Sequence, residues 1–341
     1  MGGKVFTAGI LGCGDYLRQE LGKLKACREL KIKSLFDPDG ERAKRYAEEF
    51  DGASAVGSAD VLYDDGGIDL MLIFTPPNIR RGLVVKAAEK GKHVITTKPL
   101  AAKTEDCAAM LAAVKKAGVG CAVFTNRTDN AAAETMKRIS DSGEIGKIAL
   151  YKQDWLHHYP HWNNWATSSE NNGGPFMDAM IHNLNIARYL IGGDVVSYTF
   201  NSDNYAQKIN CNDTELLKVN FSGGGSTLLF ITWAGDLRIF DKSINAREHL
   251  DVRYIITDRG WFITEDEVDG KRVVKAAKND QVKTWPIKGF DVNAYDRSVI
   301  AMREGKPLEY DITDAYKDIE IINQAMENRD TGKSIDLSHI K

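Results

Sequence analysis

The sequence is poor in cysteine and proline, and it has neither a long apolar run nor a strong charge of one sign. Five cysteines, an odd number without close pair spacing, do not form a disulfide framework and are typical of reduced, mostly buried thiols. No run of about 18 apolar residues occurs, so we expect no membrane span. A net charge of −3 argues against nucleic acid or an anionic membrane as partner. The cysteines are Cys13, Cys27, Cys107, Cys121 and Cys211.

The N-terminal residues, MGGKVFTAGIL, carry one lysine and run directly into a strand pattern. We therefore expect no signal peptide. Phe6 stands where a myristoylation motif requires serine or threonine, so we expect no lipid anchor. Together with the free cysteines, these features predict a cytoplasmic protein.

The chain is long enough for two domains, and its 43% hydrophobic and 27% charged residues are ordinary for a globular protein. In the first third, short apolar strands alternate with helical patterns, which predicts a doubly wound parallel α/β sheet. We predict strands over 5–11, 32–36, 69–74, 93–96 and 119–124, and helices from 39 to 50, 78 to 90 and 104 to 117.

A glycine-rich turn, Gly12-Cys13-Gly14, follows the first predicted strand and precedes a helix. Gly12 permits the tight turn, and Gly14 lets the backbone approach a pyrophosphate at the helix N-terminus. Asp15 and Tyr16 come next and are included in the expected cofactor site. The third fingerprint position is Leu17 instead of glycine or alanine, so the signal is a partial one.

Asp37 ends the second predicted strand, about 20 residues after the glycine turn, where a carboxylate accepts from the hydroxyls of a ribose and repels a 2′-phosphate. It also opens an Asp-Pro-Asp-Gly corner, and a simple turn role remains an alternative. The strand ending at 74 leads into Thr75, Pro76 and Asn78, a loop of the kind where cofactors dock.

Lys98 follows the strand over 93–96 and projects from the carboxyl edge of the predicted sheet. An ammonium there would stabilise a developing alkoxide and join in proton transfer. The alternative is a solvated loop lysine, the commonest fate of this residue type.

Asp178 and His182 lie four residues apart in the stretch 171–193, NNGGPFMDAMIHNLNIARYLIGG, which reads as a helix between two glycine pairs. On a helix they share one face, so the carboxylate can orient the imidazole as a general base. The alternative is a surface histidine on a helix whose Asp178 favours the helix dipole.

From residue 147 the pattern changes to alternating strands and glycine turns, which predicts an antiparallel sheet. We predict strands over 148–154, 195–205, 215–221, 226–233, 250–257, 260–265 and 271–275. The last helices, 291–303 and 313–328, are expected to pack back across the domains. An open sheet face with Phe230, Ile231 and Trp233 would need covering, which suggests a homodimer or homotetramer.

An aromatic and histidine-rich segment at 154–165 predicts a small-ligand site, because aromatic faces stack on sugar rings and polar groups pair with hydroxyls. Packing of the segment on its own aromatics is an alternative. A zinc site is a further alternative, but a proline interrupts the segment and we expect no metal. The candidate substrate residues are Asp154, Trp155, His157, His158, His161, Trp162 and Trp165.

The glycine turn, the Lys98-Pro99 pair and the Gly-Gly…Asp-x-x-x-His helix, in this order, resemble the glucose-fructose oxidoreductase / inositol dehydrogenase (Gfo/Idh/MocA) family. The resemblance covers essentially the whole chain. It implies a Rossmann domain followed by an α+β domain with a large, mainly antiparallel open sheet, and a catalytic set of Lys98, Asp178 and His182. The chain departs from the family pattern at Thr97, usually glutamate, and at Met180, usually glycine.

These features predict an NAD-dependent dehydrogenase of a sugar, polyol or glycoside hydroxyl, with NADP less favoured. We expect a dinucleotide-binding domain over 1–125 and a substrate and oligomerisation domain over 126–341. Two alternatives remain open. One is NAD-assisted glycoside cleavage without net redox, and the other is a non-catalytic sugar sensor, which would need no base.

Overall fold

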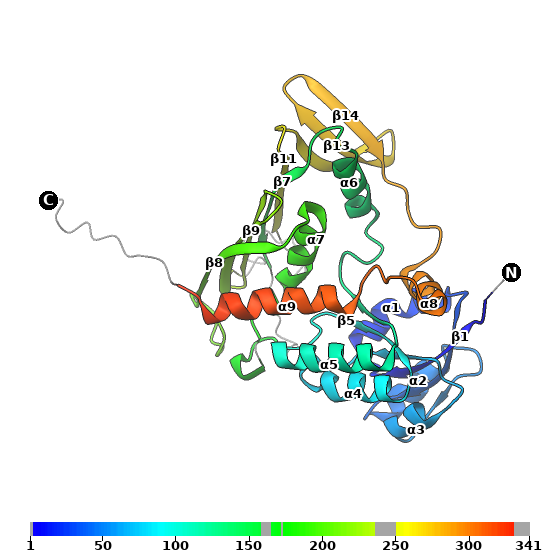
Figure 1. Cartoon of the computed structure of the whole chain (residues 1–341). Coiled ribbons are helices and arrows are strands. Elements are labelled where there is room, and N and C mark those ends of the chain that lie inside the picture. Colours follow the sequence, from blue (N-terminus) through cyan, green and yellow to red (C-terminus); the bar gives the residue numbers. More distant parts are fainter. Residues whose placement is uncertain (1–2, 158–164, 172, 236–249, 331–341) are drawn as a thin grey trace. The chain divides into compact units, whose positions relative to one another are not determined.

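A computed structural model describes residues 3–157, 165–171, 173–235 and 250–330 (Figure 1). The chain divides into two compact units. The first comprises Met1–Thr135 and Pro286–Glu320, and the second comprises Met136–Trp285 and Ile321–Lys341. The predicted fold class, a Rossmann-like parallel sheet and a mainly antiparallel sheet, is confirmed.

The first unit contains a parallel six-stranded sheet with the order β3-β2-β1-β4-β5-β6. This order reverses between β1 and β4, and in such sheets ligands bind beyond the carboxyl ends of the strands at that point. The strands are β1 (Phe6–Leu11), β2 (Leu30–Phe36), β3 (Ser54–Ala55), β4 (Leu70–Ile73), β5 (His93–Thr97) and β6 (Cys121–Phe124).

Helices of the first unit fill the crossovers of this sheet, and the expected positions of α2, α4 and α5 are confirmed to within three residues at each end. The short β3 and α3 were not predicted, because two and six residues carry too little periodicity to be recognised. The helices are α1 (Asp15–Lys25), α2 (Gly40–Ala47), α3 (Ala59–Asp64), α4 (Pro77–Glu89), α5 (Thr104–Ala117) and α8 (Ala294–Glu304).

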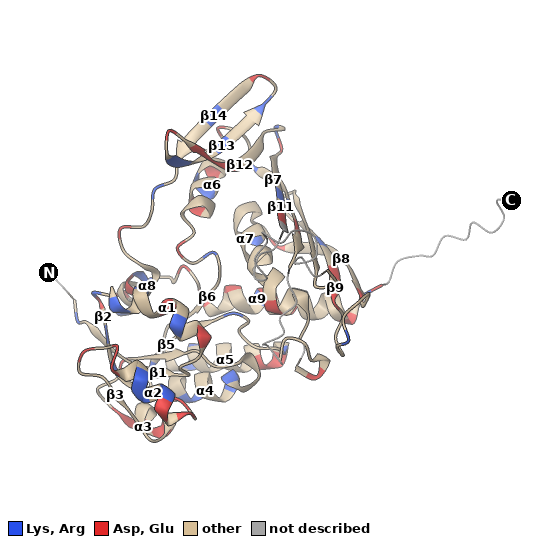
Figure 2. Cartoon of the chain, turned by 180° about the vertical axis from the view of Figure 1, so that it is seen from behind, with Lys and Arg blue, Asp and Glu red and all other residues tan. Residues whose placement is uncertain are grey.

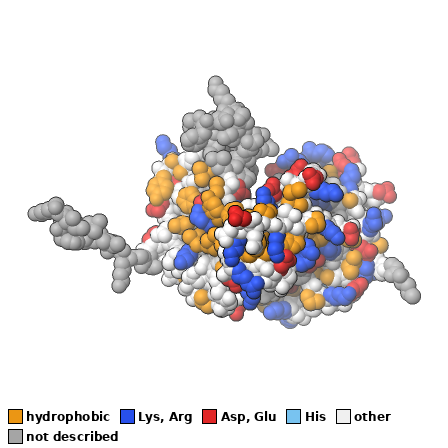
Figure 3. Space-filling model, turned by 90° about the horizontal axis from the view of Figure 1, so that it is seen from above, with side chains coloured by type: hydrophobic (Ala, Val, Ile, Leu, Met, Phe, Trp, Pro, Cys, Tyr) orange, Lys and Arg blue, Asp and Glu red, His pale blue; other side chains and the backbone are white. Residues whose placement is uncertain are grey.

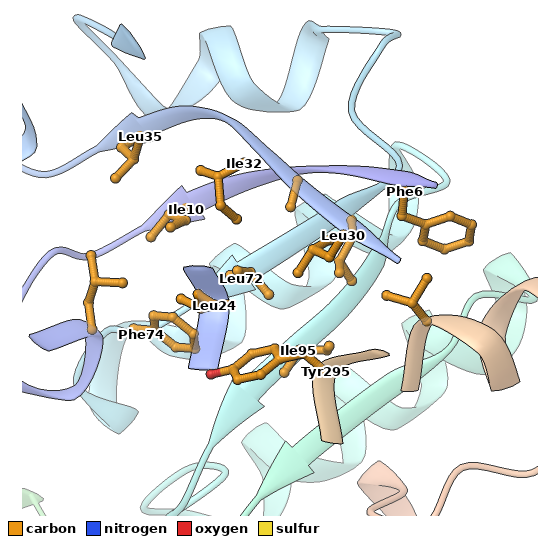
Figure 4. Close-up of a cluster of buried hydrophobic side chains, with 14 of the residues drawn as sticks. Phe6, Ile10, Leu24, Leu30, Ile32, Leu35, Leu72, Phe74, Ile95 and Tyr295 are labelled. Atoms are coloured by element: carbon orange, nitrogen blue, oxygen red, sulfur yellow. The ribbon is translucent and has the colours of Figure 1, made fainter. Parts of the chain in front are cut away.

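The core of the first unit joins strand residues to the late helix α8 (Figure 4). Tyr295 of α8 is fully buried, and its ring lies against Phe124 of β6, with the centroids 4.9 Å apart. Asp296 fixes the same helix to the start of β2, because its carboxylate accepts the backbone N–H groups of Arg28 and Glu29 at 2.9–3.1 Å. A segment remote in sequence therefore completes this core.

The second unit contains an eight-stranded sheet with the order β14-β13-β12-β11-β7-β10-β9-β8. Its central pair, β7 and β10, is parallel, and the other registers that are defined are antiparallel. The predicted two-residue turn at Asp269-Gly270 joins Val268 to its register partner Lys271. The strands are β7 (Ile148–Leu156), β8 (Val195–Asp203), β9 (Thr214–Phe221), β10 (Ser226–Thr232), β11 (Leu250–Thr257), β12 (Phe262–Val268), β13 (Lys271–Lys278) and β14 (Gln281–Pro286).

Two longer elements were also not predicted. One is α6, although Asn130 gives a capping signal, since its side chain accepts the N–H of Ala133 at 3.0 Å. The other is β14, whose largely exposed residues show little apolar alternation. The remaining helices are α6 (Ala131–Ser142), the 3₁₀ turn η1 (Ser169–Asn171), the π-helical η2 (Phe176–Met180), α7 (Ile181–Ile191) and α9 (Ile312–Glu327).

One face of the second sheet is covered and the other is largely exposed. Helix α7 packs on β7 and β10. Ile231 and Trp233 are fully buried, so the expectation that they lie on the open face is wrong. Phe230 is half-buried and belongs to the opposite face, because successive strand residues alternate between faces. Its lateral neighbour Leu216 is 39% exposed.

Acidic and basic side chains are intermixed over the surface (Figures 2 and 3). Within the described ranges, no helix combines the length and apolarity needed to cross a membrane. The five cysteines are free thiols, and four of them are buried, as the sequence predicts.

Candidate functional site

The first part of the candidate site is the Gly12–Gly14 turn between β1 and α1. Gly12 has φ = 91°, and an added Cβ would lie 2.7 Å from the carbonyl oxygen of Phe74, so a side chain is excluded there. At Gly14, by contrast, no atom lies within 4 Å of an added Cβ. Gly14 is the N-cap of α1, and no side chain caps this helix. The turn therefore offers open space beside helix N–H groups, which fits the pyrophosphate of a dinucleotide.

Asp37, at the end of β2, binds this turn through a hydrogen bond. Its carboxylate is 5% exposed and accepts the N–H groups of Cys13 and Asp39, each at 2.8 Å, and it pairs with Arg42 at 2.6 Å. Burial acts to raise the pKa of Asp37, but the contacts with Arg42 and with the two backbone N–H groups outweigh it, and the pKa is lowered. Arg42 was missed by the sequence analysis, although it lies five residues after the predicted ribose carboxylate.

Three acceptor positions of Asp37 are thus occupied, out of the roughly four that a carboxylate offers. One position on Oδ2 remains for a further donor.

The loop after β4 holds the predicted residues Thr75 and Pro76, and Asn78 lies in the first turn of α4. Pro76 and Asn78 are exposed, whereas the Oγ1 of Thr75 is buried without a hydrogen-bond partner. A buried hydroxyl without a partner is uncommon in proteins, and a ligand group can supply the missing contact. Of the other predicted cofactor residues, Asp15 is exposed and pairs with Arg18, and Tyr16 packs edge-on against Phe74 with the ring centroids 5.0 Å apart.

The loop after β5 carries Lys98, which is half-buried. Its backbone N–H donates to the carbonyl of Phe124 at 3.1 Å, and the Lys98–Pro99 peptide is cis. The buried guanidinium of Arg80 contacts carbonyl groups on both sides of Lys98. Arg80 also donates to the carbonyl of Thr75, so it connects the loops after β4 and β5. Nothing in the local sequence pattern singles out this arginine.

In the second unit, Asp178 and His182 lie on consecutive helical segments. Asp178 belongs to the π-helical η2, and His182 belongs to the first turn of α7. The π winding replaces the predicted α-helix at this point, and such segments occur frequently at functional sites. From Gly173 to Ala187 every residue is buried except Asp178 and His182, which are half-buried. This helix therefore presents a carboxylate and an imidazole from an otherwise buried surface.

A buried glutamate lies beneath the start of this helix. Oε2 of Glu215 on β9 accepts the N–H of Phe176 at 2.7 Å, and the hydroxyl of Ser202 donates to Oε1 at 3.4 Å. An added Cβ at Gly174 would lie 3.0 Å from the same carboxylate. Sequence reasoning missed Glu215, because the contact with Phe176 spans 39 positions.

The predicted substrate residues do not all lie on one face of the second sheet. Trp155 is 7% exposed, and its ring centroid lies 4.9 Å from that of His157. Asp154 precedes Trp155 on β7 and therefore points to the opposite face, where it pairs with Lys152. Trp165 is half-buried and packs on Ala166, Cys211 and Trp233. His158, His161 and Trp162 lie outside the described residues.

Two polar residues share the face of Trp155. Gln153 is buried, and its amide donates to both carboxylate oxygens of Asp251 at 2.8 Å. Asp251 stands directly opposite Trp155 in the register of β7 and β11. An aromatic side chain beside hydrogen-bonding groups is the arrangement that suits a polyhydroxylated ligand. Within the part of the chain that the structure describes, no group of three or more His, Cys, Asp or Glu side chains could hold a metal ion.

Comparison with known proteins agrees with these two units. Residues 6–125 match the family model described as "Oxidoreductase family, NAD-binding Rossmann fold", and residues 133–241 match the one described as "GFO/IDH/MocA C-terminal domain". The aldose-aldose oxidoreductase of Caulobacter crescentus has the same fold, with a TM-score of 0.80 and 20% identity over 98% of this chain and 100% of that chain.

Two curated relatives differ in the reaction that they are named for. The scyllo-inositol 2-dehydrogenase (NAD(+)) of Bacillus subtilis is 36% identical over 171 residues, which is 49% of this chain and 48% of that protein. The 2,7-anhydro-N-acetylneuraminate hydratase of Mediterraneibacter gnavus is 27% identical over 231 residues, 66% of this chain and 60% of that protein. The match thus spans about half the length of the first relative.

Proposed function

Because this chain belongs to the GFO/IDH/MocA family of oxidoreductases with an NAD-binding Rossmann fold, we propose that it is an NAD(H)-dependent dehydrogenase of a CH–OH group in a sugar, polyol or glycoside. The observation that carries the proposal is the pair Asp178 and His182, which stay accessible on a helix that is otherwise buried from 173 to 187.

In the proposed mechanism His182 removes the proton of the substrate hydroxyl, and Asp178 orients the imidazole and stabilises its protonated form. Lys98 stabilises the negative charge that develops on the substrate oxygen. A nicotinamide held by this domain would supply the hydride acceptor or donor for the substrate carbon. The Gly12–Gly14 turn and Thr75 would hold the pyrophosphate, and Asp37 would accept one ribose hydroxyl.

We assign substrate binding to Trp155 and His157, with Gln153 and Asp251 as neighbouring polar groups. Asp154 is left out of this set because it points to the other face of the sheet. NAD is favoured over NADP, because the Asp37 carboxylate would repel a 2′-phosphate. Arg42 offsets part of this repulsion.

The experiment is a screen of NAD reduction over monosaccharides, polyols, inositols and glycosides, followed at ~340 nm, where reduced nicotinamide absorbs. With the best substrate, His182→Ala and Lys98→Met should each lower kcat by roughly 10²- to 10⁴-fold, the usual contribution of acid–base and oxyanion groups. A His182→Ala enzyme that kept most of its turnover would end this assignment.

A second candidate is cofactor-assisted elimination or cleavage without net redox, favoured by the relative named as a hydratase. The same residues would remove and return protons, and the cofactor would end in its starting form. Release of reduced cofactor in proportion to product would exclude this candidate. Product formation with no net change in the cofactor would support it.

We further propose a cytoplasmic homodimer or homotetramer that uses the exposed face of the second sheet. The five free thiols suit a reducing compartment. On that face Leu216, Phe230, Val252, Tyr254 and Phe262 form an apolar surface that we call the outer sheet patch. Four of them are 37–45% exposed, and Phe230 is half-buried. The division into a cofactor domain over 1–125 and a substrate domain over 126–341 also stands as part of this proposal.

A further inference from the structure

Arg80 on α4 is a buried arginine whose side chain bonds to backbone carbonyls. Its side chain is 1% exposed, and its Nη1 donates to the carbonyl oxygens of Thr97 at 2.6 Å, of Leu100 at 3.3 Å and of Pro99. Its Nη2 donates to the carbonyl of Thr75. One guanidinium therefore binds four backbone carbonyls in the loops that follow β4 and β5.

The charge of Arg80 has no acidic counterpart within the described residues. Burial lowers the pKa of Arg80 to about 10, and the groups that act to raise it are Tyr16, Cys107 and Cys121, none of which is a carboxyl. Its Nε is buried without a hydrogen-bond partner. Burying a cation without a carboxylate is costly, so carbonyl dipoles alone must compensate it. Stability is a poor explanation for a group held in this way.

The carbonyls that Arg80 contacts are placed around Lys98. The Thr97 carbonyl belongs to the peptide group that enters Lys98, and the Pro99 carbonyl belongs to the peptide group that follows Pro99. The guanidinium therefore holds the backbone one peptide before and one residue after this lysine. The neighbouring Arg81 differs in every respect: its side chain is 56% exposed and pairs with Asp106 at 3.1 Å. Adjacent arginines on one helix thus have separate roles.

We propose that Arg80 is a positioning residue that acts through Lys98. Its planar fork holds the loop 97–100 against the loop at Thr75, and this fixes the direction in which the Lys98 side chain leaves the sheet. The inference rests on the proposed function of Lys98. A displacement of about 1 Å of a reacting group can cost roughly 10²-fold in rate, so such a support has a measurable effect.

The first test is a double-mutant cycle of Arg80→Met and Lys98→Met, measured as kcat and KM with the best substrate of the NAD reduction screen. If Arg80 acts through Lys98, Arg80→Met lowers kcat by about 10- to 100-fold in the wild type and causes no further loss in the Lys98→Met background. Multiplicative losses in the double variant would overturn the proposal. If Lys98→Met alone kept the wild-type kcat, the proposed function of Lys98 would be refuted instead. The two failures are therefore distinguishable.

The second test needs no turnover. Hydrogen exchange of the 97–102 backbone should rise several-fold in Arg80→Met, because four carbonyl contacts are lost, while α5 (Thr104–Ala117) stays protected. Arg80→Lys keeps the charge but not the fork, and it should not restore slow exchange or kcat. Arg81→Met is the matched control and should leave both unchanged. Slow exchange in Arg80→Met, or full rescue by Arg80→Lys, would contradict positioning by the fork.

Discussion

At the residue scale, Asp37 and Arg42 present two opposite preferences at the ribose position of the proposed cofactor. The carboxylate suits the 2′-hydroxyl of NAD, and a guanidinium nearby suits the 2′-phosphate of NADP. The pair is joined at 2.6 Å, with Asp37 buried and the side chain of Arg42 39% exposed. The carboxylate is also bonded to the glycine turn through the N–H of Cys13, so removing it affects both the ribose contact and the turn.

We expect Asp37→Ala to weaken NAD binding by roughly 10- to 100-fold, since a hydrogen bond to a charged group contributes about 1.5–3 kcal/mol. Binding of NADP should weaken less, because the repulsion of the 2′-phosphate disappears and Arg42 becomes available to it. Titration of both nucleotides against the wild type, Asp37→Ala and Arg42→Ala measures this directly. A larger loss for NADP than for NAD in Asp37→Ala would remove the ribose role.

At the element scale, Glu215 is bonded to the start of the helical segment that carries Asp178 and His182. The glutamate side chain lies where η2 begins, and its carboxylate accepts the N–H of Phe176. Burial raises the pKa of Glu215 to about 7, against weaker opposing contributions from the N–H of Phe176, from Ser202 and from Arg329. Between pH 4.5 and about 7 the Glu215 carboxyl is therefore largely ionised in the unfolded chain but largely protonated in the folded chain.

The sign of the stability effect follows from this raised pKa. Below the ordinary value of 4.5 the carboxyl is protonated in both states, and its contribution is fully present. As the pH rises from there to about 7, the unfolded chain releases the proton first, and stability falls by roughly 3 kcal/mol. Glu215→Gln keeps an acceptor for Phe176 but cannot ionise. Its unfolding free energy should therefore decline less than that of the wild type between about pH 5 and pH 8.

Chemical denaturation at several pH values gives the required comparison. Glu267→Gln serves as the control, because Glu267 is an exposed residue of β12 in the same sheet. Parallel pH profiles for the wild type and Glu215→Gln would show that this carboxyl does not titrate in the proposed range.

At the scale of the whole molecule, the outer sheet patch is the feature that bears on assembly. It consists of two apolar groups: Leu216 pairs with Phe230 across β9 and β10, and the rings of Tyr254 and Phe262 lie 6.2 Å apart. Lys152 and Asp154 of β7 lie between the two groups. Apolar side chains on a broad open face are typical of an interface between subunits. The proposed partner is a second copy of the chain.

If this face forms the interface, Leu216→Glu should place a charge beside Phe230 and shift the assembly toward the monomer of 37.8 kDa. Light scattering coupled to size exclusion measures the mass over a range of concentrations. Val61→Glu is the control, because Val61 is 50% exposed on α3 of the first unit. A wild-type mass already equal to the monomer, or the same shift for both variants, would refute the outer sheet patch as the interface.

The sequence by itself determined the elements whose residues repeat at a regular period. Buried parallel strands and their crossover helices gave the first sheet, and alternation with turns such as Asp269-Gly270 gave the second. The glycine turn, Asp37, Lys98 and the pair Asp178 and His182 also stand out by residue type and spacing, because these signals lie within a few positions of an element end.

The tertiary structure alone decided which distant groups share a contact. Arg80 spans two loops, Glu215 reaches Phe176 across 39 positions, and Trp155 of β7 stands opposite Asp251 of β11. No local period encodes such contacts, because they depend on how separate elements are brought together in the fold. The chemical groups can therefore be named from the sequence, whereas the residues that hold them in place emerge only when the chain is folded.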